Sequence, residues 1–194
     1  MFLSQAYAIY FGLFVAIFVL VNPLITSVYV SGYETSIGWM GFWNNMVAVV
    51  AFVTIGRLLD RYHRYRLTAV LLNLGSMFLW LVFVVVLTTS ASSFTTLYVI
   101  YVLLGVVFVP FFSSGIEQAA EMTYPVSEVT SSSVMLLLGN AYAFVFIVVF
   151  GLLTQDRYVN VVGYIMVALY CLAALLASMT KTELHRKVSE KSVG

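Results

Sequence analysis

Charged side chains are scarce in this sequence of 194 residues, of which only 9% are Asp, Glu, Lys or Arg. A soluble domain carries about a quarter, so the composition excludes an ordinary soluble protein. The net charge is +1, and in the absence of a substantial basic patch we expect no nucleic-acid partner. A single cysteine excludes an intrachain disulfide, and we expect Cys171 to be a small buried hydrophobe inside an apolar run.

Hydrophobic residues make up 62% of the chain, and the mean hydropathy is +1.03. A transmembrane helix needs about 20 mostly apolar residues. The N-terminal stretch has no basic region and no clean cleavage site, so we interpret it as a mature helix and not as a signal peptide. Six stretches qualify as spans: 3–28, 37–57, 67–88, 95–115, 130–154 and 159–180. The sequence therefore predicts an all-α membrane protein with a six-helix transmembrane bundle over 1–180 and a polar tail at 181–194.

Lysine and arginine residues predict the orientation, because they concentrate in cytoplasmic connections. The connection after the second span carries four arginines, and the tail carries four basic residues. With six spans, both segments lie on the same side of the membrane. The connections around 31–36, 88–95 and 155–157 hold one basic residue in total. We therefore expect both termini and the tail to be cytoplasmic, in the plasma membrane or in an endolysosomal or mitochondrial membrane.

Polar residues within the spans mark candidate packing and binding points. Asn22-Pro23 predicts either a discontinuous first helix that exposes its backbone to a substrate or simple helix termination near the surface. The adjacent Asn44 and Asn45 cannot both face one partner, so we expect at least one of them to bond across helices. The packing points expected in the third and fourth spans are Asn73, Gly75 and Gly105.

The connection GRLLDRYHRYR, residues 56–66, resembles the cytoplasmic motif of the major facilitator superfamily, Gly-x-Leu-x-Asp-Arg-x-Gly-Arg-basic. It lies between the second and third spans, as it does in each half of those proteins. We expect the motif glycine to permit close helix approach, and the aspartate to pair with an arginine or to cap a neighbouring helix, so that the motif latches one gate state. The alternative is a charge run that only fixes the topology. The matching residues are Gly56, Leu58, Asp60, Arg61 and Arg64.

A second polar segment, GIEQAAEMTYPVSEVTSSS at 115–133, separates the fourth and fifth spans. Glu117 and Glu121 are four residues apart, so on a continuing helix they share one face, where like charges call for a cation, water or a protonated carboxyl. Just before the segment, Pro110 predicts either a kinked, gate-forming helix or a tolerated membrane proline. A cytoplasmic helix-turn-helix pinned by charge is the purely structural alternative for the segment.

The middle of this segment predicts a helix boundary. Tyr124-Pro125 should end the preceding helix, because a residue before proline avoids helical geometry. We expect Pro125 in the first turn of the fifth span and Glu128 near the positive end of its dipole. The hydroxyl side chains of 130–133 should pack tightly or bond to carbonyls one turn back.

The run EMTYPVSEVTSS, starting at Glu121, resembles the Glu-x-Thr-Tyr-Pro-x-x-Glu-x-Thr-Ser-Ser segment of the feline leukaemia virus subgroup C receptor family. Gly115 and Glu117 match the Gly-x-Glu that precedes it, and the tail from Lys181 resembles the family's basic ending. The resemblance covers essentially the whole chain and implies equivalence to the C-terminal half-bundle of a twelve-span major facilitator transporter. It also implies alternating-access transport of choline, ethanolamine, haem or pyridoxine-like solutes.

The resemblance also suggests site residues. A glutamine that lines the central site in choline-carrying members corresponds here to Asn140, which is shorter but has the same donor and acceptor groups. Interhelical packing is the alternative role for Asn140. In choline-carrying members, a tyrosine of the seventh span forms part of an aromatic cage around a quaternary ammonium group. The resemblance aligns that tyrosine with Val15, which has Phe14 and Phe18 beside it and Asn22 on the same span.

We expect a transporter and not an enzyme, because no span contains a histidine base and no G-x-S-x-G motif is present. No metal site and no cofactor is expected. The expected partners are the lipid bilayer, a small organic solute, and a missing N-terminal half or a second copy that completes the cavity; we expect an incomplete gene model, an alternative transcript or a split gene. The alternative function is a non-transporting fragment that acts as a receptor or as a regulator of full-length carriers.

Overall fold

A computed structural model describes residues 2–29, 32–62, 65–89, 94–123, 126–155 and 158–179, and within these ranges some side chains near the helix ends are left undescribed. The described chain is helical, with six helices long and apolar enough to span a membrane. They are α1 (Phe2–Thr26), α2 (Glu34–Tyr62), α3 (Tyr65–Thr88), α4 (Phe94–Thr123), α5 (Glu128–Gln155) and α6 (Val159–Ser178). The six-helix prediction is confirmed, and the chain is a multi-pass membrane protein.

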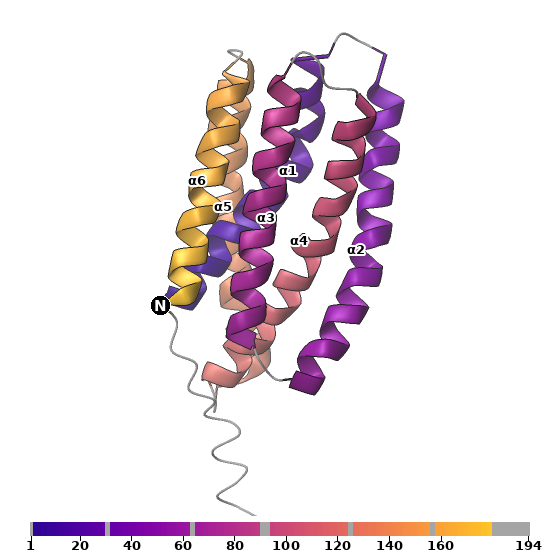
Figure 1. The fold of residues 1–194 in the computed structure, drawn as a ribbon. Helices are drawn as coiled ribbons and strands as arrows, with labels where there is room; N and C mark the ends of the chain where they lie inside the picture. The colour runs from indigo at the N-terminus through magenta and orange to yellow at the C-terminus, as the bar shows by residue number, and fades with distance from the viewer. Residues whose placement is uncertain are drawn as a thin grey trace, which may run out of the picture.

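The helices run alternately up and down, so that α1 begins and α6 ends at the same end of the bundle (Figure 1). Close helix contacts link α1 to α5 and α6, α3 to α4 and α6, and α2 mainly to α4. α1 is the most deeply buried helix, whereas α2 and α5 expose most of their surface. The six helices therefore form one bundle with two largely uncovered helices.

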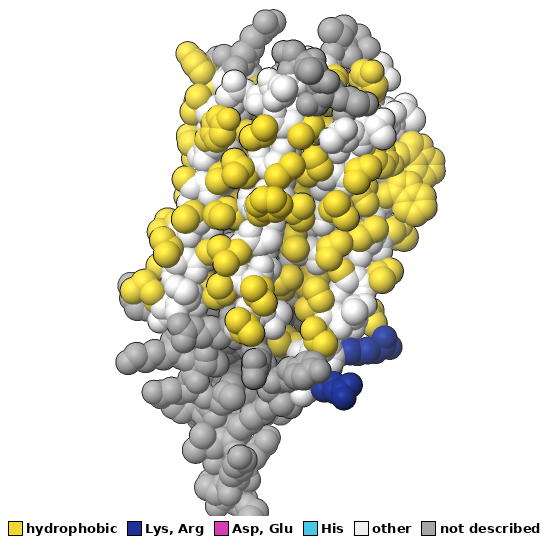
Figure 2. Space-filling model, viewed as in Figure 1, with side chains coloured by type: hydrophobic (Ala, Val, Ile, Leu, Met, Phe, Trp, Pro, Cys, Tyr) yellow, Lys and Arg dark blue, Asp and Glu magenta, His cyan; other side chains and the backbone are white. Residues whose placement is uncertain are grey.

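The outer surface of the bundle is apolar, as expected for contact with lipid. Figure 2 shows hydrophobic side chains over most of the visible face, with basic side chains at the lower end. The described basic residues Arg57 and Arg61 belong to the last turns of α2. Cys171 is exposed on α6, so the expectation that it is buried is wrong. A thiol in a membrane helix is equally stable whether it faces lipid or protein. The hydrophobic periodicity of the span therefore does not show which of these environments Cys171 faces.

Glycines set the distance between the main helix pairs. A Cβ on Gly12 of α1 would lie 2.8 Å from Cβ of Tyr142 in α5, and a Cβ on Gly139 of α5 would lie 2.6 Å from the ring of Phe11. Small residues at such contacts let helix backbones approach in a membrane, where no hydrophobic force drives association. Gly105 of α4 lies against the backbone of Asn44 in α2, which confirms its predicted packing role.

Pro23 does not break α1, which continues unbroken to Thr26. The discontinuous-helix interpretation of Asn22-Pro23 is therefore wrong, and the helix ends within a turn of the proline. The hydroxyl of Thr26 donates to the carbonyl oxygen of Asn22 (2.9 Å), and that of Ser27 donates to Leu24 (2.8 Å). The last carbonyl groups of a helix have no N–H partner within it, and these hydroxyls donate to them instead.

α4 also continues through its proline, Pro110, and ends at Thr123 just before Tyr124-Pro125. The predicted boundary at Tyr124 itself lies outside the described residues. α5 begins at Glu128, and the expected first-turn residue Pro125 lies outside the described residues. Ser127 caps the helix, because its Oγ accepts the N–H of Thr130 (3.2 Å).

Candidate functional site

A groove of about 360 Å³ lies between α1 and α2, near the end of the bundle at which α1 ends and α2 begins. It is the most polar of the three pockets described below, and its side chains come from α1, α2 and α4. Three aromatic rings, two amides and one carboxylate border it: Phe18, Asn22, Glu34, Phe42, Asn45 and Tyr101. We call it the α1–α2 groove.

The chemistry of the α1–α2 groove suits a small organic cation. Glu34 is exposed at the first residue of α2, where a carboxylate is also stabilised by the positive end of the helix dipole. Phe18 and Phe42 are 49% and 47% exposed, so their faces are open to a ligand. Aromatic faces attract ammonium groups, and a nearby carboxylate adds charge complementarity. The groove volume falls within the range of small-molecule sites.

Sequence reasoning found Phe18 and Asn22 but missed the α2 side of the groove. Phe42 and Asn45 lie one turn apart on α2, with Asn45 donating to the carbonyl of Gly41 in its own helix (2.8 Å). Asn44 is buried and donates across to the carbonyl of Tyr101 (2.7 Å), which confirms that one of the two asparagines bonds between helices. The sequence signal that could have indicated the α2 side of the groove was Glu34, an isolated acidic residue at the start of a span.

Phe14 and Asn140 lie outside the α1–α2 groove. Phe14 is partly buried and packs edge-on against Phe108 of α4, with ring centroids 5.5 Å apart. Asn140 is exposed on α5, and its amide nitrogen donates to the carbonyl of Leu136 one turn back (2.8 Å). The bond that the structure gives Asn140 is thus within its own helix, and Asn140 faces away from the six-helix bundle. Val15, at the family's cage-tyrosine position, is half-buried on α1.

The two predicted gating segments are only partly described. Gly56 lies in α2, but nothing described lies within 4 Å of the place where a Cβ would be, so close helix approach at Gly56 is not seen in this bundle. Arg61 and Glu128 are exposed on the first or last turns of their helices. The remaining gating positions, either wholly or in their side chains, lie outside the described residues: Asp60, Arg64, Glu117, Glu121, Tyr124 and Pro125.

The hydroxyl run after Glu128 bonds as expected. Ser132 donates to the carbonyl of Glu128 (2.8 Å), and Ser131 donates to that of Ser127 (3.3 Å). These two side chains therefore bond to the backbone of α5. Among the described residues, no cluster of His, Cys, Asp or Glu could hold a metal ion.

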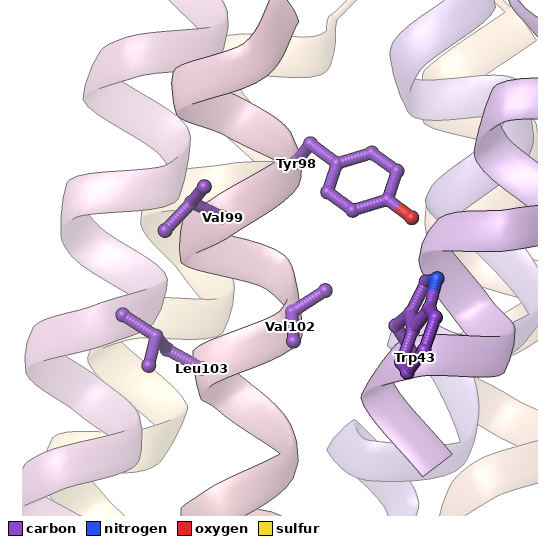
Figure 3. Close-up of a pocket in the computed structure, with 5 residues that line it drawn as sticks. All are labelled: Trp43, Tyr98, Val99, Val102 and Leu103. Carbon is purple, nitrogen blue, oxygen red and sulfur yellow. The ribbon is translucent and has the colours of Figure 1, made fainter. Parts of the chain in front are cut away.

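Two further pockets follow the seam between α2 and α4. Figure 3 shows the first, of about 300 Å³, in which Trp43 of α2 faces Tyr98 and Val102 of α4. The second, of about 470 Å³, continues from Trp43 along α2. Their linings are almost wholly apolar, so they offer a polar solute few anchors and suit lipid chains better.

Comparison with known proteins finds similarity to membrane transporters. No protein-family model matches it. An uncharacterized MFS-type transporter of Caenorhabditis elegans is 32% identical over 129 residues, which are 66% of this chain and 22% of the relative. The choline/ethanolamine transporter FLVCR1 of Felis catus is 28% identical over 181 residues, 93% of this chain and 32% of the relative. The choline/ethanolamine transporter flvcr2a of Danio rerio is 26% identical over 205 residues, 97% of this chain and 40% of the relative.

These relatives are named as transporters and not as enzymes, and the chain spans less than half of the length of each. Matches that cover most of this chain but only part of its relatives agree with six helices where a complete carrier of this superfamily has twelve. The chain is therefore similar over most of its length to part of MFS-type and feline leukaemia virus subgroup C receptor-related transporters, and its six helices are consistent with a C-terminal half-bundle of such a carrier.

Proposed function

We propose that this chain forms one half of a carrier that moves a small organic ammonium compound of the choline or ethanolamine class across a membrane by alternating access. The observation that carries the proposal is the α1–α2 groove, which combines open aromatic faces with the carboxylate of Glu34. Relatives named choline/ethanolamine transporters support the same substrate class. Haem and pyridoxine-like solutes, the family's other substrates, lack a cationic ammonium group that would use this combination.

A six-helix bundle supplies one wall of a transport pathway, so the proposal requires a second bundle. α2 and α5 are the least covered helices, and Asn140 lies exposed on α5. A second bundle against these faces, either an N-terminal half or another copy of the chain, would enclose Asn140 and place its amide beside the solute. Both termini then face the cytoplasm, and the α1–α2 groove opens on the opposite side.

Uptake by a complete carrier tests the proposal. The chain is joined to the N-terminal half of a relative, inserted into vesicles, and supplied with radiolabelled choline or ethanolamine. Uptake above that of empty vesicles is expected. A correctly inserted chimera that is inert to both solutes, and to haem and pyridoxine, would favour the alternative of a fragment that regulates full-length carriers.

Two carboxylates at equivalent helix positions separate binding from gating. Glu34 and Glu128 are each the first residue of a helix, so their interaction with the helix dipole is matched. Glu34→Gln should raise KM for the ammonium solute about two- to fivefold, the range of an exposed charge pair, with kcat unchanged. Glu128→Gln should alter kcat if Glu128 belongs to the inner gate. An unchanged KM in the Glu34 variant would remove the groove from the binding path.

Substitutions of Asn140 and Asp60 test the proposed solute contact and the proposed gate latch. Asn140→Leu should abolish uptake at normal surface expression if its amide contacts the solute, whereas wild-type uptake would make Asn140 a packing residue. Asp60→Asn should change the turnover rate if the motif of residues 56–66 latches a gate. An unchanged rate would leave that motif only its role in topology.

A further inference from the structure

Four buried polar side chains lie in the bundle interior on α1, α3 and α6. We call Tyr10, Asn73, Ser76 and Tyr170 the interior polar cluster, and each of them is at most 2% exposed. They lie in the half of the bundle nearer to the start of α1. Polar groups buried in a membrane protein need hydrogen-bond partners, because neither lipid nor an apolar core supplies any.

Helix register brings Asn73 opposite Tyr170. The indole N–H of Trp80 in α3 donates to the carbonyl of Gly163 in α6 (3.3 Å), which fixes the level of these antiparallel helices. Asn73 lies seven residues before Trp80, and Tyr170 lies seven residues after Gly163. Seven residues are about two helical turns, so each residue stays on the face of its contact and both move the same distance along the bundle.

Tyr10 and Ser76 close the cluster on the side of α1. The rings of Tyr10 and Tyr170 have centroids 5.5 Å apart, and the Tyr10 hydroxyl lies 2.5 Å from Oγ of Ser76, one turn from Asn73 on α3. The Tyr10 hydroxyl also lies 3.1 Å from the carbonyl oxygen of Val107, and the Ser76 hydroxyl lies 2.8 Å from the carbonyl oxygen of Leu72. The two hydroxyls of Tyr10 and Ser76 supply only two protons for these three contacts. Their oxygens therefore keep lone pairs that can accept a hydrogen bond from a further donor.

Asn73 and Tyr170 lack partners among the described residues. Both amide atoms of Asn73 and the hydroxyl of Tyr170 are buried without a hydrogen bond, although each can donate and accept. We infer that the interior polar cluster binds internal water, which bridges the Asn73 amide to the Tyr170 hydroxyl and to the Tyr10–Ser76 pair. A buried water makes two to four hydrogen bonds, and the cluster offers that number.

The cluster favours water over an ion. Its four side chains are neutral, so a bound cation would bring an uncompensated charge into the membrane interior. Tyr7, one turn before Tyr10 on α1, has another buried hydroxyl without a described partner and can extend the water chain toward the end of the bundle.

Radiolytic footprinting of the full chain in lipid nanodiscs detects such water, because hydroxyl radicals formed from bound water label the side chains beside it. Tyr170 should be labelled although it is fully buried. Trp80 and Met40 are matched controls, since they are reactive and at most 1% exposed, and they should stay unlabelled. A Tyr170 as unreactive as Met40 would overturn the inference.

The sign of a thermal shift gives an independent test. If water bridges the cluster, Asn73→Leu removes its hydrogen bonds and lowers Tm by about 2–4 °C, the shift for one net hydrogen bond in a chain of this size. If the cluster is dry, the same change removes an unpaired amide and raises Tm, which would refute the inference. Asn44→Leu, which breaks a direct bond to Tyr101, is the control and lowers Tm in either case. A Tm that rises with sodium would identify an ion and also overturn the assignment.

Discussion

Gly105→Ala tests the attachment of α2 to the bundle. α2 contacts the other described helices mainly through α4, and at Gly105 the two backbones approach so closely that a Cβ would overlap the carbonyl oxygen of Asn44. The same Cβ would lie 3.2 Å from the Asn44 amide nitrogen, which donates to Tyr101 (2.7 Å). The obstructing atom is backbone, so the added methyl group has to separate the helices.

The magnitude follows from three opposing effects. Overpacking costs about 1–3 kcal/mol, and loss of one interhelical hydrogen bond in a membrane adds about 0.6 kcal/mol. Replacing glycine by alanine within a helix returns about 1 kcal/mol. We therefore expect a net loss of about 0.6–2.6 kcal/mol, or a fall in Tm of about 1–10 °C for a chain of this length.

Gly38→Ala in α2 is the matched control, because nothing lies within 4 Å of its added methyl group. It should leave stability unchanged or raise it by up to about 1 kcal/mol, since only helix propensity changes. Both variants are purified in the same detergent and unfolded by heat, with helicity followed by circular dichroism. If Gly105→Ala proves as stable as Gly38→Ala, the close α2–α4 contact is not what holds α2 in place.

Three further substitutions test local contacts. Asn44→Leu should reduce stability by about 0.6–1.7 kcal/mol, whereas the exposed Asn45→Leu should stay within about 0.5 kcal/mol in the same denaturant titration; equal losses would contradict the assigned roles. Gly163→Ala should cost up to about 2 kcal/mol after the gain in helix propensity, because its Cβ would lie 2.6 Å from a methyl of Val84; a stabilised variant in thermal unfolding would mean that α3 and α6 separate easily. Ser127→Ala should cost about 1 kcal/mol by removing the cap of α5, with faster hydrogen exchange confined to its first turn; unchanged exchange there would rule out the cap.

Interior prolines show where sequence reasoning about the fold was limited. Asn22-Pro23 predicted either an interrupted first helix or a helix end near the surface. α1 is not interrupted and ends at Thr26, within a turn of the proline, where the hydroxyls of Thr26 and Ser27 bond to its last carbonyls. A proline thus predicts a local loss of one hydrogen bond, but neighbouring groups decide whether the helix ends there.

The candidate site was predictable on one helix only. Phe18 was named through the family resemblance and Asn22 through the proline that follows it, whereas Glu34, Phe42 and Asn45 come from α2. No periodicity within one span indicates which face meets another helix when all faces are apolar. Asn140 illustrates the same limit, because the sequence does not show whether its side chain faces the interior of the bundle or its surface.

The sequence by itself determined six membrane helices, their approximate ends and the family resemblance, because lipid demands long apolar segments and the family motifs are local strings of residues. Tertiary structure alone decided that α1 is central, that α2 and α5 are uncovered, and that Asn73 and Tyr170 are buried in the interior. Those facts depend on the rotation of each helix about its own axis. Close approaches at glycines such as Gly12 and Gly105, and a few interhelical hydrogen bonds, fix that rotation, whereas hydrophobicity does not.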